Sequence, residues 1–241
     1  MFDELSNLES ETGYIPSDSP TQTIGYTVVS KLEKVTHPIP LRSLDKTKNI
    51  IDINKFINQV VSLLMLKYDG LTVELDYDGG ILIQGSTRGD GYVGEDITHN
   101  VKVFKNVPLH IPFKGFLRVT GEAIIHKDDF DRINENLTDE EKKKLKGGKY
   151  KNARNLVAGT VRQLDSKICA ERNVYFMPWD IIEGFETDSR FTELQKLNEY
   201  GFTPNTDMFY IPTTIKENTL SDMFNTLKNK AKNKNIPIDG L

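Results

Sequence analysis

The segment Leu66-Lys67-Tyr68-Asp69-Gly70 places a primary amine two residues before a carboxylate. Residues i and i+2 of a β-strand point to the same face, so on a strand the side chains of Lys67 and Asp69 point together. A lysine acts as a nucleophile only when its amine is neutral, and burial or nearby cations favour that state. The segment therefore predicts covalent catalysis through Lys67. An ordinary surface ion pair remains the alternative for so short a motif.

The elements around this segment indicate how Lys67 would be positioned. A strand is predicted over residues 62–69, after a helix over 52–61 in which apolar residues recur at helical spacing. Residues 71–77 alternate apolar and polar side chains, and Asp78-Gly79-Gly80 supplies a tight turn before a strand over 81–87. The candidate nucleophile thus leads into an antiparallel hairpin.

The rest of the chain mixes strands and helices without a regular alternation. Two more strands are predicted, over residues 116–125 and 174–182. Helices are predicted over residues 2–10, 128–136, 152–164, 191–200 and 220–231, with one more beginning at the capping box of Thr138 and Glu141, whereas 13–25 has the composition of a loop. Strand pairs interleaved irregularly with helices indicate an α+β fold rather than a regular βαβ winding.

Composition narrows the class of protein. The 241 residues are 37% hydrophobic and 27% charged, and no apolar run approaches the ~20 residues of a membrane span. The N-terminus lacks the pattern of a secretory leader, so we expect a cytoplasmic protein that does not contact membranes. Cys169 is the only cysteine and is expected in the core, which excludes a disulfide framework. The net charge of −4 argues against a surface that binds nucleic acid throughout.

Two lysine-rich stretches, residues 142–146 and 228–234, are candidates for local contact with DNA. Each lies on or beside a predicted helix, and charge runs are usually solvated faces. Any contact with DNA would therefore be local or supplied by other parts of a larger assembly.

Six blocks of sequence resemble, in order, the motifs of the adenylation domain of bacterial-type NAD⁺-dependent DNA ligases. The Lys67 segment is similar to the family's K-x-D-G motif, and the last block is the most specific. The other blocks are Ser19-Pro20-Thr21-Gln22 to Gly25, His37-Pro38-Ile39-Pro40-Leu41-Arg42-Ser43-Leu44, residues 87–98 with Thr-Arg-Gly-Asp-Gly, Gly121-Glu122, and residues 152–165 with Arg-Gln-Leu-Asp. The resemblance extends from about residue 2 to residue 240.

This resemblance implies a nucleotidyltransferase fold, with two antiparallel sheets, flanking helices and a nucleotide cleft between them. It implies that residues 1–25 are a remnant of an N-terminal helical subdomain for nicotinamide mononucleotide (NMN) plus a linker, and that residues 26–241 are the adenylation domain. The activity implied is the first step of DNA nick sealing, in which Lys67 takes AMP from NAD⁺ and NMN is released.

The resemblance also assigns roles to residues. Lys67 and Asp69 are expected to be catalytic, and Mg²⁺ is expected to be held by Asp239 and Glu122, since this hard cation prefers oxygen ligands. The cofactor NAD⁺ or its AMP moiety is expected to contact Asp3, Ser43, Leu44, Arg88, Glu122, Arg154, Arg162 and Trp179. Arginine suits the phosphate and ribose side because its guanidinium stays charged and binds oxyanions through two hydrogen bonds.

Two of these assignments have simpler alternatives. Arg154 and Arg162 are eight residues apart, about 80° in projection if one helix carries both, so they could serve one groove; two exposed helix arginines are the other possibility. Trp179 would stack on adenine, but it could equally be an ordinary core residue.

Three departures from the family bear on activity. Met65 stands where the family usually has a glutamate that reads the adenine amino group. Little of the NMN-binding subdomain precedes Phe2-Asp3, and Leu241 falls just before a motif lysine. We therefore expect that this polypeptide alone does not seal nicks, that nicked DNA is bound only with additional domains or a second chain, and that the chain is a monomer.

Two competing functions remain open at this point. The chain could be a degenerate or split-ligase module that binds NAD⁺ or AMP without independent ligase activity. Alternatively, it could belong to the capping guanylyltransferases or ATP-dependent ligases that share K-x-D-G, although the Arg-Gly-Asp-Gly and Arg-Gln-Leu-Asp blocks argue against this. Gly89 to Gly94 also fits G-x-G-x-x-G, but it follows an antiparallel hairpin instead of opening a helix within a βαβ unit.

Overall fold

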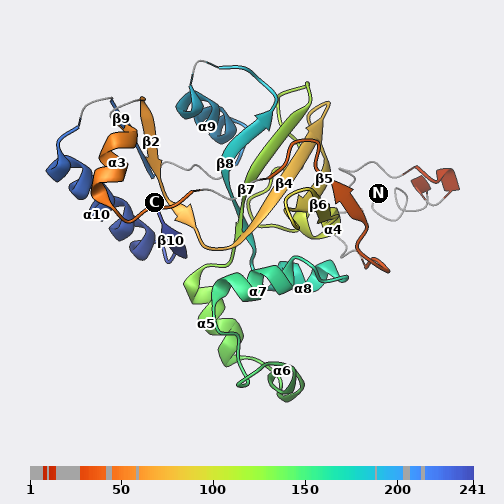
Figure 1. Cartoon of the computed structure of the whole chain (residues 1–241). Helices are drawn as coiled ribbons and strands as arrows, with labels where there is room; N and C mark the ends of the chain where they lie inside the picture. Colours follow the sequence, from red (N-terminus) through yellow and green to blue (C-terminus); the bar gives the residue numbers. More distant parts are fainter. Residues whose placement is uncertain are drawn as a thin grey trace.

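The computed structural model describes residues 8–9, 11–14, 28–41, 45–57, 60–187, 189–202, 207–212 and 215–241. At its centre is a four-stranded antiparallel sheet in the order β5-β4-β7-β8 (Figure 1). These strands are β4 (Leu71–Asp78), β5 (Ile81–Thr87), β7 (Leu117–Ile124) and β8 (Tyr175–Glu183). The predicted hairpin is confirmed, and both of its turn glycines, Gly79 and Gly80, have positive φ as a tight hairpin turn requires.

The two faces of this sheet differ in chemistry. On one face the alternate residues Val73, Leu75 and Val119 are fully buried in the main core. That core also includes residues of the helices α4 (Thr98–Val101), α7 (Ala153–Thr160) and α8 (Ser166–Glu171). On the other face, polar residues stand directly opposite one another in the pairs Thr72 with Glu122, Glu74 with Thr120 and Asp76 with Arg118. The sheet therefore presents a polar row that ends at Glu122.

Three two-stranded ribbons accompany the sheet among the described residues. They are β1 (Lys34–Thr36) with β6 (Val93–Glu95), β2 (Ser62–Met65) with β9 (Met208–Ile211), and β3 (Lys67–Tyr68) with β10 (Ile238–Gly240). The prediction of one continuous strand over residues 62–69 is therefore wrong. The strand is divided at Leu66 because its two halves pair with different partners, and neither partner strand has a strong sequence pattern.

The ribbons of β2 and β3 lie against two helices, α3 (Ile50–Ile57) and α10 (Glu217–Asn233) (Figure 1). Leu66 and Tyr68 pack with Leu227 and Ala231 of α10 in one small core, and Ile211 packs with Leu220 in another. The core around Leu66 and Tyr68 also includes Ile124 of β7 and Met177 of β8, so the strand that carries Lys67 packs between α10 and the end of the four-stranded sheet.

Further helices in the described part of the chain are α5 (Lys127–Glu135), α6 (Asp139–Lys144) and α9 (Arg190–Glu199). The capping box is confirmed, because the Thr138 hydroxyl accepts from the Glu141 amide and the Glu141 carboxylate accepts from the Thr138 amide. The predicted helix over 152–164 is too long: α7 ends at Thr160, and Asp165 caps a separate helix, α8. Cys169 is fully buried, as expected of a core residue.

The α+β class is confirmed, with antiparallel sheets flanked by helices. None of the described helices has the length and apolar character that crossing a bilayer would need.

Candidate active site

Lys67 lies on β3 directly opposite Gly240 of β10, so the ribbon brings it next to Asp239. Its Nζ donates to both carboxylate oxygens of Asp239, at 2.5 and 2.7 Å. The side chains of Lys67 and Asp239 are 42% and 35% exposed, so solutes can reach the amine. A charged residue 172 positions away in the sequence is thus the immediate partner of the candidate nucleophile.

Arg154, at the start of helix α7, lies next to the pair of Lys67 and Asp239. Asn152 caps the helix through its side-chain oxygen, which accepts from the Asn155 amide at 2.8 Å, and Arg154 follows in the first turn. Arg154 Nη1 lies 3.7 Å from Asp69 Oδ1 and 4.0 Å from Asp239 Oδ2. The structure therefore brings together four residues that the sequence had proposed from distant segments.

Glu122 completes the cluster from the polar face of the sheet. Its Oε2 accepts from the Thr72 hydroxyl at 3.2 Å. Burial raises the pKa of Glu122 to about 7, although the Thr72 hydrogen bond and the positive charges of Arg154, Lys67 and Arg88 act in the opposite direction. Three cations and three carboxylates are thus close enough to influence one another, which is a suitable setting for binding a phosphate group.

The raised pKa of Glu122 makes stability depend on pH. Because the folded pKa lies above the value of 4.5 expected for the unfolded chain, the charge on Glu122 disfavours folding as the pH rises through about 7. Glu122→Gln should therefore raise the free energy of unfolding relative to wild type at about pH 8.5, by at most about 3 kcal/mol, and by much less at about pH 5. Urea unfolding at both pH values measures this, with the exposed Glu135→Gln as a control. Equal effects at the two pH values would contradict it.

Gly70, the last residue of the lysine motif, has a steric role. A Cβ atom at this position would lie 2.0 Å from the carbonyl oxygen of Ala123 and 3.0 Å from Cγ of Glu122. The chain can therefore pass this close to β7, and keep Asp69 near Glu122, only with glycine at position 70.

Gly70→Ala should consequently lower the free energy of unfolding by about 1–3 kcal/mol or more, because backbone must move to admit the methyl group. Gly159→Ala is the matched control, since nothing lies within 4 Å of its Cβ and the residue is within α7. That substitution should raise the free energy of unfolding by about 0.5–1 kcal/mol. Urea titrations compare the two variants, and an unchanged midpoint for Gly70→Ala would contradict the steric argument.

Arg88 begins the turn that joins β5 to β6. The Asp90 carboxylate accepts from the amides of Tyr92 and Val93, at 2.9 and 2.8 Å, and these hydrogen bonds lower its pKa. Gly89 has φ of +57°, and a Cβ there would lie 1.8 Å from the Val93 carbonyl oxygen. The Arg-Gly-Asp-Gly block is therefore a rigid loop, fixed by one carboxylate and by glycine at a point where no side chain fits.

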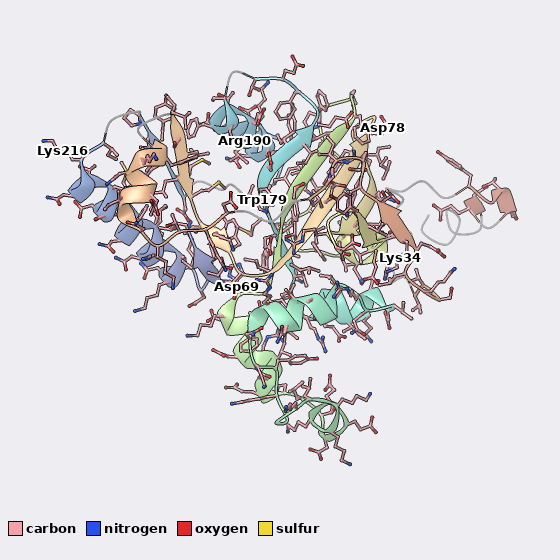
Figure 2. The ribbon with its side chains drawn as sticks, viewed as in Figure 1. Lys34, Asp69, Asp78, Trp179, Arg190 and Lys216 are labelled. Atoms are coloured by element: carbon pink, nitrogen blue, oxygen red, sulfur yellow. The ribbon has the colours of Figure 1, made fainter. Side chains whose placement is uncertain are left out.

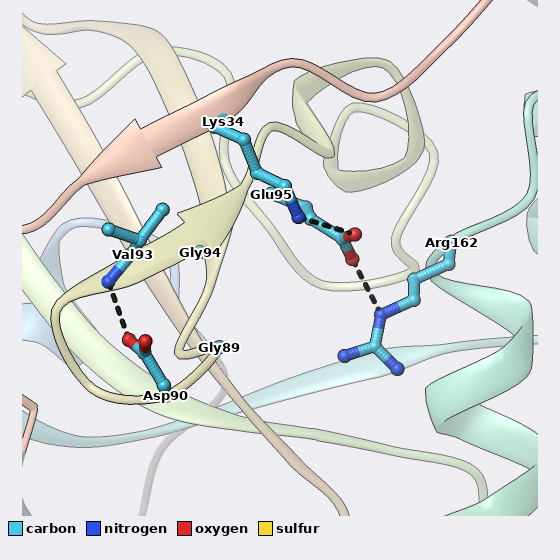
Figure 3. Close-up of a pocket in the computed structure, with 7 residues that line it drawn as sticks. All are labelled: Lys34, Gly89, Asp90, Val93, Gly94, Glu95 and Arg162. Carbon is cyan, nitrogen blue, oxygen red and sulfur yellow. Dashed lines mark hydrogen bonds and ion pairs between the residues drawn. The ribbon is translucent and has the colours of Figure 1, made fainter.

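Arg162 does not share a helix with Arg154, so the expectation that both project from one helix is wrong. The helix ends two residues earlier, and Arg162 Nε donates to Glu95 at 2.8 Å, with Lys34 on the other carboxylate oxygen at 3.1 Å. These residues line an open hollow of about 620 Å³ beside the loop of Gly89 and Asp90 (Figure 3). Contact between Arg162 and the cofactor stays a prediction.

Trp179 lies at a bulge in β8. Thr120 pairs with Asp180 and Gly121 with Pro178, so Trp179 is the extra residue between them. A bulge of this kind redirects a side chain. Figure 2 shows Trp179 between the four-stranded sheet and the β2–β9 ribbon, with Asp69 further along the same side. Its partial exposure is compatible with a stacking platform and does not fit a fully enclosed core residue.

Three predicted contact residues, Asp3, Ser43 and Leu44, lie outside the described residues. Among the residues that are described, no group of three histidine, cysteine, aspartate or glutamate side chains could hold a metal ion.

Sequence reasoning assigned no role to a buried charged network behind the site. Arg118 binds both oxygens of Asp76, at 2.8 and 2.6 Å, and lies 3.5 Å from Glu74, which contacts His37. Glu74 and Asp76 were visible as the polar positions of an alternating strand. Nothing in that pattern shows that they would be buried.

Comparisons with known proteins agree with this arrangement. The sequence model of the NAD-dependent DNA ligase adenylation domain matches residues 29–241. The chain is 40% identical to a DNA ligase of Ruminiclostridium cellulolyticum over 247 residues, which covers 100% of this chain and 36% of that protein. It is 42% identical to a DNA ligase of Lachnoclostridium phytofermentans over 84% of this chain and 30% of that protein, and 35% identical to one of Mycoplasma capricolum over 98% and 36%.

The chain thus spans about a third of the length of these relatives. The family match covers most of the sequence, and it includes the segments that carry Lys67, Asp69, Arg88, Glu122 and Arg154. This chain belongs to the NAD-dependent DNA ligase adenylation domain family.

Proposed function

We propose that this chain transfers AMP from NAD⁺ to Lys67, as the first step of nick sealing. The neutral Lys67 nitrogen forms a bond to the adenylyl phosphorus, and the P–O bond to NMN breaks with its electron pair left on the departing oxygen. The proton displaced from nitrogen passes to solvent. The observation that supports this most directly is the convergence of Lys67, Asp69, Asp239 and Arg154 within contact distance.

The charged residues around Lys67 can assist both the deprotonation of its amine and the binding of the phosphate. Lys67 must lose a proton before it can attack, and Asp239 is the hydrogen-bond acceptor in contact with it. Arg154 and Arg88 supply positive charge for the phosphate oxygens, which would stabilise the charge that develops as the bond to NMN breaks. Arg162, Ser43 and Leu44 would contact the remainder of the nucleotide, with Trp179 stacked on the adenine ring.

Asp239 and Glu122 would hold Mg²⁺. Both provide carboxylate oxygens, and Glu122, with a pKa raised to about 7 by burial, is a group whose charged form an added cation would favour. Bound there, Mg²⁺ would supply further neutralisation of the phosphate charge. With only two protein carboxylates, the ion would depend on other oxygen ligands.

NAD⁺ recognition would extend to the segment 1–25, where Asp3 is the candidate for contact with NMN. Nicked DNA would be the later substrate, bound together with further domains or a second chain, as the relatives of greater length are DNA ligases.

Intact-protein mass spectrometry tests the proposal. The chain is incubated with NAD⁺ and Mg²⁺, or with ATP and Mg²⁺, and the expected result is an acid-labile AMP adduct from NAD⁺ that peptide mapping places on Lys67. An adduct from ATP alone would exclude NAD⁺ as the donor. If no adduct forms but NAD⁺ raises the melting temperature, the chain is a binding module instead.

With Met65 in place of a glutamate, the site is expected to distinguish adenine only weakly from other purine bases. Met65 stands opposite Met208 in the β2–β9 ribbon, and a thioether is a poor acceptor for an amino group. AMP and inosine monophosphate should therefore bind with affinities within about fivefold of each other, whereas Met65→Glu should favour AMP by roughly tenfold or more. Calorimetric titration with both nucleotides measures the ratio, with Met208→Leu as the control. Strong AMP preference in the wild type would show that backbone groups read the base.

A further inference from the structure

We infer that His37 is a positioning residue for Arg88: its ring fixes the Thr87 carbonyl and thereby the direction in which the chain leads Arg88 into the site. The inference deepens the proposed function and rests on it for its kinetic test. Two structural measurements on the same residue do not depend on that function.

The His37 ring is fully buried and makes a hydrogen bond at each nitrogen. Nε2 lies 3.0 Å from the carbonyl oxygen of Thr87, and Nδ1 lies 3.0 Å from Oε1 of Glu74. A carbonyl oxygen can only accept, so Nε2 carries hydrogen and donates to Thr87. This donor is aimed at the peptide that joins Thr87 to Arg88.

Backbone contacts join the same segment to the rest of the Arg88 loop. The His37 amide donates to the Tyr92 carbonyl at 2.8 Å, and the Leu41 amide donates to Gly91 at 2.9 Å. A Cβ on Gly94 would lie 2.9 Å from His37 Nε2 and 1.7 Å from the Thr87 oxygen. The ring therefore packs against the base of the loop, where its two ends meet.

A short path leads from Thr87 to the active site. The Arg88 amide donates to the Thr72 carbonyl at 3.1 Å, and the Thr72 hydroxyl donates to Glu122 at 3.2 Å. The positive charge of Arg88 acts on Glu122. A rotation of the Thr87–Arg88 peptide would disturb the Thr72 contact and the approach of the guanidinium together.

Glu74 holds the ring in place from the other side. Its side chain is 4% exposed, and Arg118, which also binds Asp76, lies 3.5 Å away. The ring orientation is thus set by a network that is itself buried and charged.

Two substitutions separate the two hydrogen bonds. The amide nitrogen of glutamine reaches as far from the backbone as Nε2 of histidine, whereas that of asparagine reaches only as far as Nδ1. His37→Gln can keep the donor to Thr87, and His37→Asn cannot. We expect His37→Asn to slow single-turnover adduct formation from NAD⁺ by roughly tenfold or more, and His37→Gln to stay within about threefold of wild type. His126→Gln is the control, because the ring of His126 contacts Tyr175 and not the Arg88 loop.

A double-mutant cycle shows whether His37 acts through Arg88. If it does, His37→Asn slows the reaction no further once Arg88 is alanine. Multiplicative losses in the double variant, or equal losses in the asparagine and glutamine variants, would overturn the inference. Inactivity of the wild type with NAD⁺ would instead count against the proposed function.

Structure is checked independently of activity by nuclear magnetic resonance on ¹⁵N-histidine-labelled wild type. The expected spectrum has one imidazole Nε2–H, absent from both His37 variants, that exchanges slowly with solvent. This measurement remains decisive if His37→Asn does not fold. A rapidly exchanging His37 ring would overturn the inference.

Discussion

Lys67→Arg is expected to reduce formation of the AMP adduct by at least about 10³-fold while the protein stays folded. Arginine keeps the positive charge, and with it an ion pair with Asp239, but its guanidinium stays protonated in proteins and offers no nucleophilic nitrogen. Intact-mass time courses with NAD⁺ measure the loss, and thermal melting verifies the fold.

Lys228→Arg provides the matched control, since Lys228 is an exposed lysine of α10. It should react at the wild-type rate. Persistence of an acid-labile adduct in Lys67→Arg would mean that a different side chain takes the AMP.

Arg118→Met should have the largest effect on stability. The Arg118 side chain is 10% exposed and binds Asp76 through two hydrogen bonds, with Glu74 and Glu183 each 3.5 Å away. Removing the guanidinium leaves buried carboxylates without compensation, which typically lowers the free energy of unfolding by about 3–5 kcal/mol. Urea unfolding measures the change.

The sign of the pH effect tests the cause. Burial already raises the pKa of Glu74, and the charge of Arg118 opposes that rise. Without Arg118 the folded pKa of Glu74 should rise further, so the destabilisation should grow as the pH rises and shrink in acid. Arg132→Met is the control, because the Arg132 side chain is 49% exposed in its ion pair with Asp129. Its loss should lower the free energy of unfolding by less than about 1 kcal/mol. If Arg118→Met and Arg132→Met lowered the free energy of unfolding by similar amounts, burial of the Arg118 network would not be the cause of the destabilisation.

Local sequence patterns predicted most of the central sheet and the long helices. The alternation in residues 71–77 and the turn at Gly79 and Gly80 specify a hairpin through local chemistry alone, and β4 and β5 follow it. The short ribbons were missed, because β3 and β10 contain two and three residues and pair only when distant segments meet. The division of the strand at Leu66 is likewise decided by its partners.

For the site, resemblance to the family predicted the functional residues, and the structure places five of them together. Lys67, Asp69, Glu122, Arg154 and Asp239 interact through contacts or charge. The helix geometry assumed for Arg162 failed because Asp165 begins a new helix, which shortens α7. His37 belongs to a matched block, but the sequence assigns it no role, since only its tertiary neighbours reveal that both ring nitrogens are used.

The β3–β10 ribbon has a consequence for how activity responds to heat. Two strands of two and three residues, with an irregular register, add little stability of their own. The four-stranded sheet does not include either strand, so the ribbon can open while the sheet stays intact. Opening separates Lys67 from Asp239. Lys67 should therefore lose its contact with Asp239 at a temperature below that at which the domain unfolds, and regain it on cooling.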